Sequence, residues 1–244
     1  MFKINEDMEC SVKGLIERLA ATGEPFEMNE ALEWVSRHTE VTLRKVQQTV
    51  YDMVHRHELV RVGTGQFRNV RADKAVFSVE LSEQEQKLSR TLRLQFPELT
   101  CCLFNGSVLA RLGGDRRGDR MTYVMVERFA IDKVYQYLKG IYPAVWLSAT
   151  DAEVELPTDR SQAGIVVRPL HIKAPIIRKG GQVFPALEQL LVDVRKDQAF
   201  AYLPKEETDT IWAKATERYY INVSRLKGYA KRRHLELDDY QLCA

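Results

Sequence analysis

Apolar residues recur at intervals of three and four positions in three short segments near the N-terminus. The first segment runs from Glu9 to Ala20, the second starts near Asn29, and the third runs from Thr42 to about His57. This spacing places the apolar residues on one face of an α-helix, so it predicts three amphipathic helices. Asn29 and Thr42 carry short polar side chains that can cap the second and third helix. The expected apolar face of the third helix consists of Leu43, Val46, Val50, Met53 and Val54.

A different pattern follows directly after these helices. Residues 59–62 and 66–70 read as two short strands, and Gly63 and Gly65 lie between them. Two such runs joined by a glycine-containing turn predict a β-hairpin. Three short helices followed by a hairpin is the order of a winged helix-turn-helix, in which the third helix enters the DNA major groove. We therefore expect a first domain over residues 1–76.

The remaining residues, 77–244, alternate between strand-like and helical patterns. Apolar runs typical of strands lie at residues 100–104, 121–126, 144–148 and 164–168. Helical patterns lie at residues 82–96, 107–112, 131–141, 185–195, 208–219 and 222–233. Strands separated by helices predict an α/β domain. The expected fold class is therefore α+β or α/β, with an N-terminal winged helix-turn-helix followed by a mixed α/β domain with C-terminal helices.

DNA contacts in a winged helix come from the outer face of the third helix and from the hairpin. The candidate residues on the helix are Thr42, Arg44, Lys45, Gln47, Gln48 and Tyr51. Arg suits guanine edges and Gln suits adenine edges, each giving about 1–3 kcal/mol of discrimination when bidentate. The hairpin adds side chains suited to phosphate contact, which are Arg61, Thr64, Gln66, Arg68 and Arg71.

The charge distribution supports these candidates. Hydrophobic content is 45% and charged content 29%, which is ordinary for a globular protein. The net charge of +2 is uneven, because residues 1–41 hold four Lys/Arg and nine Asp/Glu, whereas residues 42–74 hold seven and three. Positive charge confined to the third helix and the hairpin predicts salt-dependent binding to double-stranded DNA. The alternative is that this face is merely solvated and that the winged helix docks on a protein.

A second basic stretch lies near the C-terminus. Between residues 218 and 234 the chain has no acidic residue and interleaves Tyr219, Tyr220 and Tyr229 with basic side chains. The basic residues are Arg218, Arg225, Lys227, Lys231, Arg232 and Arg233. They predict either a second nucleic-acid patch or a docking face for an acidic partner. The alternative is that these cations favour the C-terminal ends of helices, where the helix dipole is negative.

Two patterns raise the question of an enzyme. The segment Asn105–Ser107 follows an apolar strand and resembles the start of a nucleotidyltransferase pattern, but Asp115 and Asp119 follow too loosely for a metal-binding carboxylate pair. A turn and helix cap is the favoured interpretation. Alternating carboxylates would share one face of a strand at Asp151, Glu153 and Glu155, but no lysine lies near them. A divergent nuclease or nucleotidyltransferase with a DNA-binding winged helix is the alternative function.

Other polar residues give no convincing site. His171 and Lys173 could bind an anion, although a lone histidine after a strand is usually structural, and the spacing of Glu188 and Asp193 puts them on different helix faces. The four cysteines lack metal-ligand spacing and are Cys10, Cys101, Cys102 and Cys243. We therefore expect no catalytic residue, metal or cofactor. The sequence also shows no signal peptide and no membrane span, and the cysteine usage favours a reducing cytoplasm.

Several segments resemble AbiEi-like antitoxin proteins. Residues 184–194, with the sequence FPALEQLLVDV, look like the P-x-x-E-x-x-L-V-D helix of that family. Residues 215–222 and 226–233 are also similar to it, and so is the order of winged helix, α/β domain and basic helices.

This resemblance implies an antitoxin of a type IV toxin–antitoxin system, a class connected with phage defence. Members use the winged helix to repress their own operon, and their C-terminal domain contributes to counteracting a separate nucleotidyltransferase toxin. They are not known for a catalytic activity of their own. The expected partners are therefore double-stranded DNA of the chain's own operator and a nucleotidyltransferase-type toxin, and no membrane.

Overall fold

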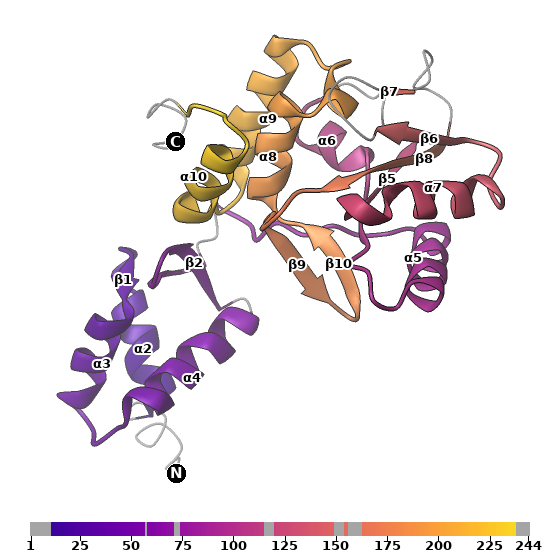
Figure 1. The fold of residues 1–244 in the computed structure, drawn as a ribbon. Helices are drawn as coiled ribbons and strands as arrows, with labels where there is room; N and C mark the ends of the chain where they lie inside the picture. Colours follow the sequence, from indigo (N-terminus) through magenta and orange to yellow (C-terminus); the bar gives the residue numbers. More distant parts are fainter. Residues whose placement is uncertain are drawn as a thin grey trace. The chain divides into compact units, whose positions relative to one another are not determined.

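The computed structural model describes residues 11–56, 58–70, 74–114, 120–148, 154–155 and 163–237 (Figure 1). The chain divides into two compact units. The first comprises residues 1–76 together with 218–225, and the second comprises residues 77–217 and 226–244. None of the described helices has the length and apolar character that a membrane crossing requires.

The first unit consists of three helices and a small antiparallel sheet. The strand order is β1-β3-β2, and Phe26 of β1 pairs with Phe67 of β3. Gly65 forms the turn between β2 and β3 with a φ of 71°, a backbone conformation that favours glycine. The elements in chain order are α2 (Val12–Ala20), β1 (Phe26–Glu27), α3 (Met28–Ser36), α4 (Leu43–His55), β2 (Leu59–Gly63) and β3 (Gln66–Asn69).

The first unit differs from the sequence predictions at two points, one in its core and one at the start of a helix. Leu15, Ile16, Val46 and Val50 are buried together, but Leu43 is 43% exposed and lies outside the core. The prediction for Leu43 was wrong because the core-facing residues of α4 begin at Val46, whereas Leu43, the first residue of the helix, stays outside the cluster.

The second difference concerns the start of α3. Asn29 was expected to cap this helix, but the cap residue is Glu27, whose backbone N–H donates to Glu30 Oε2 at 2.6 Å. The chain enters α3 directly from strand β1, so the helix begins before Asn29.

A segment near the C-terminus completes the first unit, which the sequence patterns did not indicate. Ala75 N–H donates to Arg218 O at 2.8 Å, and Tyr220 N–H donates to Ala75 O at 3.2 Å. The Tyr220 hydroxyl also donates to Asn69 O at the end of β3, at 3.3 Å. Residues 218–225 therefore hold the end of the hairpin, although residues 77–217 of the second unit separate them from it in the sequence.

The second unit is a mixed α/β domain, as predicted. Its described strands are β4 (Cys102–Asn105), β5 (Met121–Glu127), β6 (Val145–Ser148), β7 (Val154–Glu155), β8 (Gly164–Leu170), β9 (Ile176–Lys179) and β10 (Gln182–Pro185). Its helices are α5 (Glu83–Gln95), α6 (Ser107–Arg111), α7 (Ile131–Lys139), α8 (Leu187–Lys196), α9 (Lys205–Arg218, whose last residue belongs to the first unit) and the later part of α10 (Val223–Arg232). Two short 3₁₀ helices cover Arg128–Ala130 and Gln198–Phe200.

The seven described strands form one sheet in the order β7-β6-β8-β5-β4-β10-β9. Strands β6, β8 and β5 are parallel to one another, and β4 runs antiparallel to β5. The hairpin β9–β10 was not predicted, and Pro185, expected to start a helix, instead pairs with Ile176 at its end. A proline is tolerated there because the pairing ends at this residue and α8 begins two residues later.

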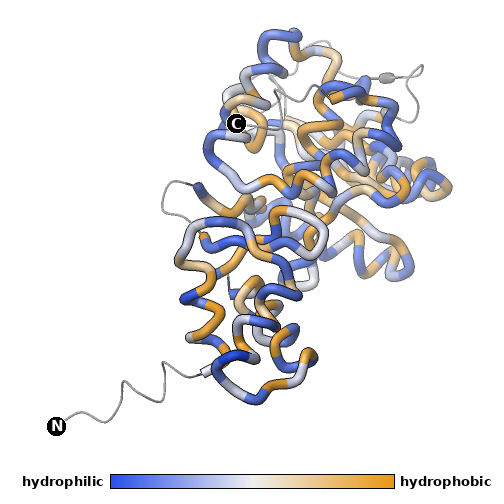
Figure 2. Tube along the Cα trace, turned by 90° about the vertical axis from the view of Figure 1, so that its left-hand side faces the viewer, coloured by the Kyte–Doolittle hydropathy of each residue, from blue (hydrophilic) through white to orange (hydrophobic). Residues whose placement is uncertain are grey.

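Helices cover both faces of this sheet (Figure 1). On one face Tyr123 of β5 packs against Phe200, and Met125 contacts Gln189 of α8. Thr122, which points the opposite way because side chains alternate along a strand, donates its hydroxyl to Glu85 of α5. The result is a three-layer α/β/α arrangement. Hydrophobic and hydrophilic residues are interspersed along the trace (Figure 2).

The contact between Tyr220 and the hairpin gives a test of the first unit. In Tyr220→Phe the hydroxyl that donates to Asn69 O is lost, so local opening of β2 and β3 should become easier by about 1 kcal/mol. Hydrogen exchange of the full chain should then be roughly fivefold faster in peptides covering β2 and β3. Peptides covering β4 and β5 are the internal control and should not change. Unchanged exchange in the hairpin would show that residues 218–225 do not stabilise it.

Candidate nucleic-acid interface

Helix α4 has a buried face and an exposed face. Thr42 precedes the helix, and its hydroxyl accepts the Lys45 N–H at 3.3 Å, so the predicted cap is present. Val46, Val50 and Met53 are buried against the other helices of the first unit. Since these residues lie along one side of α4, the opposite side is free to meet a partner.

The predicted helix residues lie mostly on this exposed side. Arg44, Gln48 and Tyr51 follow one another at intervals of four and three residues, so they form one stripe opposite the core. Thr42 and Lys45 are also exposed, whereas Gln47 is only partly so.

Two of the stripe residues already have neighbours. Gln48 Nε2 donates to Asp52 Oδ1 at 2.9 Å, and the Tyr51 ring packs edge-on against Phe67, which leaves Tyr51 48% exposed. A partner that uses Gln48 must replace its hydrogen bond to Asp52.

The hairpin candidates differ in how far they are exposed. Arg61 and Gln66 are exposed, and their side chains make hydrogen bonds to Gly63 O and to Glu27 Oε1, respectively. Arg68 is partly buried, and its Nε atom lies inside the protein. Thr64 is exposed at the turn, where its N–H donates to Ser224 Oγ at 3.3 Å. Arg71 lies outside the described residues.

The C-terminal basic residues are divided between different surroundings. Arg218 and Arg225 belong to the first unit and are exposed, whereas Lys227, Lys231 and Arg232 are exposed in the second. The Arg233 side chain is only 10% exposed, because it points into a cluster of charged groups. Arg233 therefore does not belong to an exposed patch.

This charged cluster is centred on Arg168, which is fully buried in strand β8. Arg168 Nη2 forms ion pairs with Asp193 Oδ2 at 2.8 Å and with Asp197 Oδ2 at 2.5 Å. The Tyr229 hydroxyl donates to Asp193 Oδ1 at 2.8 Å. Two Arg233 nitrogens lie 3.8 Å from the same two carboxylates, so two arginines face two aspartates.

The pKa values in this cluster follow from burial and from the opposite charges. Burial opposes the charge of Arg168, but the carboxylates of Asp197 and Asp193 outweigh it and raise the pKa of Arg168. Burial likewise opposes the charge of Asp197, but Arg168 and then the hydrogen bond with His171 lower the pKa of Asp197 below its usual range. Burial and Asp193 raise the pKa of Tyr229. The ion pair between Arg168 and Asp197 therefore stays charged at neutral pH.

The sequence patterns missed this cluster, although one signal for it was present. Arg168 is a single charged residue at the end of the apolar run 164–168, and a buried charge in such a run requires a partner. Its partner Asp193 was noted only as unsuited to a catalytic pair with Glu188. Both carboxylates are buried in α8, and Asp193 serves to neutralise Arg168.

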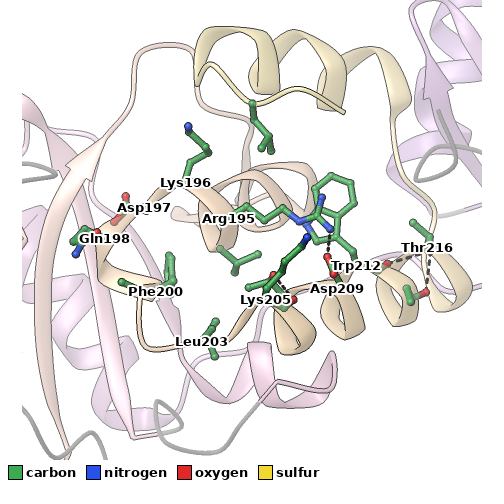
Figure 3. A pocket seen from close by; sticks show the side chains of 15 residues that line it. Arg195, Lys196, Asp197, Gln198, Phe200, Leu203, Lys205, Asp209, Trp212 and Thr216 are labelled. Carbon is green, nitrogen blue, oxygen red and sulfur yellow. Dashed lines mark hydrogen bonds and ion pairs between the residues drawn. The ribbon is translucent and has the colours of Figure 1, made fainter. Parts of the chain in front are cut away.

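A cavity of about 800 Å³ lies beside this cluster, between α8 and α9 (Figure 3). Arg195 extends over the Trp212 ring at 4.4 Å and forms an ion pair with Asp209 at 2.6 Å. The Trp212 indole N–H donates to Leu191 O. The charged pair and the indole N–H at the centre of this cavity are thus already partnered within the protein.

The patterns considered for an enzyme lead to no assembled site among the described residues. Asn105 Oδ1 accepts the Ser107 N–H at 2.8 Å, and its Nδ2 donates to Glu85, so this segment forms a turn and cap for the short helix α6. Asp115, Asp119, Asp151 and Glu153 lie outside the described residues, as does the side chain of Glu155. No group of three or more metal-ligating side chains occurs in the described ranges.

The described cysteines are not reactive thiolates. Burial, followed by the charge of Glu127, raises the pKa of Cys101 to about 11, and burial also raises the pKa of Cys102. Cys10 and Cys243 lie outside the described residues.

The charged cluster predicts a specific pH dependence of stability. In Asp197→Asn the side chain can still accept the Ala199 N–H, but it no longer pairs with Arg168, so the free energy of unfolding should fall by about 3 kcal/mol at pH 7. Because the folded-state pKa of Asp197 is lowered, its contribution is present above the unfolded pKa of about 4 and is lost as the pH falls towards the folded pKa. Urea unfolding at several pH values should therefore show the difference between the two proteins shrinking below about pH 4.

The matched control for this test is Asp209→Asn. Asp209 is half exposed and pairs with Arg195, so its loss should cost no more than about 1 kcal/mol. A difference for Asp197→Asn that is small, or that does not change with pH, would contradict the role given to Asp197.

Comparison with protein-family models identifies the family of this chain. A family model described as a family of unknown function, DUF6577, matches residues 45–241, from the first turn of α4 to near the C-terminus. No curated protein matches the chain. Because the matched residues make up more than half of the sequence, this chain belongs to the DUF6577 family.

Proposed function

We propose that this chain is a DNA-binding transcriptional regulator whose first unit is a winged helix-turn-helix. The observation that carries the proposal is the stripe of Arg44, Gln48 and Tyr51 along α4, opposite the buried face of the same helix. Arginine and glutamine on the exposed face of a helix are side chains that can read guanine and adenine in the major groove. Lys45 beside the stripe adds a cation for the phosphate backbone.

The arrangement of the first unit supports the winged-helix assignment. Its described elements follow the order helix, strand, helix, helix and hairpin, and the short strand β1 pairs with the hairpin strand β3. Helix α4 would be the recognition helix and the β2–β3 hairpin the wing. Arg61 and Gln66 are exposed on the wing and would contact phosphates.

Charge also supports DNA as the partner. Residues 42–74 carry an excess of basic side chains, whereas residues 1–41 carry an excess of acidic ones. The basic excess therefore coincides with α4 and the hairpin. Binding through these residues would weaken steeply with increasing salt, because each phosphate contact releases condensed counterions.

The resemblance to AbiEi-like antitoxins supports a more specific role. The chain would repress its own operon in the cytoplasm and would counteract a nucleotidyltransferase-type toxin through its second unit. Exposed cations near the C-terminus, such as Lys227 and Lys231, could contact such a toxin or a second nucleic acid.

A gel-shift experiment with the DNA upstream of the chain's own gene tests the proposal. The double variant Arg44→Ala, Gln48→Ala should bind this DNA at least about tenfold more weakly, because two base-reading side chains are lost. The matched control is Arg37→Ala, because Arg37 is an exposed arginine of the same unit that follows α3 and belongs to neither α4 nor the hairpin.

Circular dichroism would confirm that both proteins are folded. Equal binding by the double variant and the control would show that α4 is not the recognition helix. Failure of the unmodified chain to bind this DNA would leave the first unit as a protein-docking module and would refute autoregulation.

A further inference from the structure

A second cavity of the α/β unit, of about 890 Å³, lies where strands β5 and β8 end. Glu127 is the last residue of β5, and it pairs with Leu170, the last residue of β8. Both line the cavity, together with the residues that follow each strand and with the end of α10. Its volume is in the range of about 300–1,000 Å³ that is usual for small-molecule sites.

The topology of the sheet explains why a cavity forms at this point. Strands β5 and β8 are parallel neighbours, but the chain leaves them in different directions. After β5 it continues into α7, and after β8 it continues through the β9–β10 hairpin to α8 on the other face. In α/β sheets, a crevice at the carboxyl ends of two such strands is the usual place for a ligand.

The lining of this cavity is strongly basic. Glu127 is the one acidic residue among the described residues that line it, and both of its carboxylate oxygens accept the Thr100 N–H. The lining also contains five basic side chains, those of Arg128, Lys173, Lys196, Arg232 and Arg233. Of these, Arg128, Lys173 and Lys196 are exposed and form no ion pair with another residue of the described ranges.

Contacts with the cluster around Arg168 fix the positions of several residues that line this cavity. His171, Tyr229 and Arg233 belong both to the cavity lining and to the cluster around Arg168, so that cluster fixes their positions. Arg232 Nη2 donates to Lys173 O at 3.0 Å, and Lys173 has a φ of 56°, a conformation that residues other than glycine rarely adopt. Strained residues held by surrounding contacts are typical of binding sites.

An aromatic ring stands beside these cations. Phe129 lines the cavity next to Arg128 and is 84% exposed, as is Ile172 on the loop after β8. A large apolar side chain left this open gains free energy when a planar ring packs against it. The site therefore combines anion-binding side chains with a surface for stacking.

We propose that this cavity binds a free mononucleotide, with the phosphate held by Arg128 and Lys173 and the base packed against Phe129. Charged hydrogen bonds from arginine and lysine are the usual means of holding a phosphate, and stacking on an aromatic ring tolerates any base. The proposal goes beyond DNA binding by the first unit and does not depend on it, since all lining residues belong to the second unit.

Isothermal titration calorimetry on the full chain tests the site with AMP, GMP, ATP and GTP as probes. At least one of these nucleotides should bind saturably with one-to-one stoichiometry. Adenosine, which lacks the phosphate, and inorganic pyrophosphate, which lacks the base, should each bind at least about tenfold more weakly than the best nucleotide.

Three variants test the phosphate-binding side chains and the stacking ring separately. Arg128→Gln and Lys173→Asn should each weaken nucleotide binding by about tenfold or more, and asparagine suits the backbone conformation at position 173. Phe129→Ala should weaken nucleotide binding but not the residual binding of pyrophosphate. The control is Lys87→Ala, an exposed lysine on α5 outside the cavity, which should bind like the unmodified chain.

Three results would overturn the proposal: no nucleotide binds, adenosine binds as well as AMP, or a single-stranded RNA decamer binds while the mononucleotides do not. The substituted side chains are exposed, so the variants should keep the fold, which thermal unfolding would verify. Gel shifts with these variants should equal those of the unmodified chain, so failure of this site and failure of DNA binding can be told apart.

Discussion

The second unit depends on one buried interaction, the pairing of Arg168 with Asp193 and Asp197. A guanidinium in the middle of an apolar sheet is costly unless its charge is matched, and here two carboxylates lie within hydrogen-bonding distance. The pairing joins strand β8 to helix α8 and to the 3₁₀ helix that follows it. Through Tyr229 and Arg233 it also orients the end of α10. Such a network contributes as much by fixing one arrangement of these elements as by net stability. Apolar side chains of the same volume could fill this space without the free-energy cost of removing charges from water.

Local patterns were sufficient for most of the elements, since amphipathic helices and apolar strands leave a clear periodicity. Helix α4 is an example, because its cap Thr42 and its buried residues Val46 and Val50 were all predicted. The exceptions are elements whose stability comes from distant residues. The β9–β10 hairpin has its apolar residues as adjacent pairs, Ile176 with Ile177 and Val183 with Phe184, which leave no alternating period, and β10 pairs with β4, which lies far away in the sequence. Strand β1 has two residues, too few for any period to be visible.

The candidate sites also divide into one formed by residues close in sequence, which could be predicted, and one formed by distant residues, which could not. The stripe on α4 could be predicted because its members are close in sequence and lie on one helix. The cavity at the ends of β5 and β8 could not, since it brings together Arg128, Lys173 and Arg232 from three separate parts of the chain. Anion binding by His171 and Lys173 was considered, but a structural role was favoured, and the patterns gave no indication that the Phe129 ring lines the same cavity. Arg233 was grouped with the exposed cations because its helical position alone does not reveal two buried carboxylates nearby.

The composition of the first unit from residues 1–76 and 218–225 has a consequence for biosynthesis. A ribosome releases a chain from its N-terminus at about 5–20 residues per second, and a continuous N-terminal domain can fold while the rest is still being made. Here the partners of Ala75, Asn69 and Thr64 are translated only after residues 77–217 of the α/β unit. The hairpin of the nascent chain must therefore wait for residues 218–225 before it acquires these hydrogen bonds, and the Arg168 cluster of the second unit must likewise wait for Tyr229 and Arg233. Neither unit can reach its final contacts until this shared stretch of chain has been made.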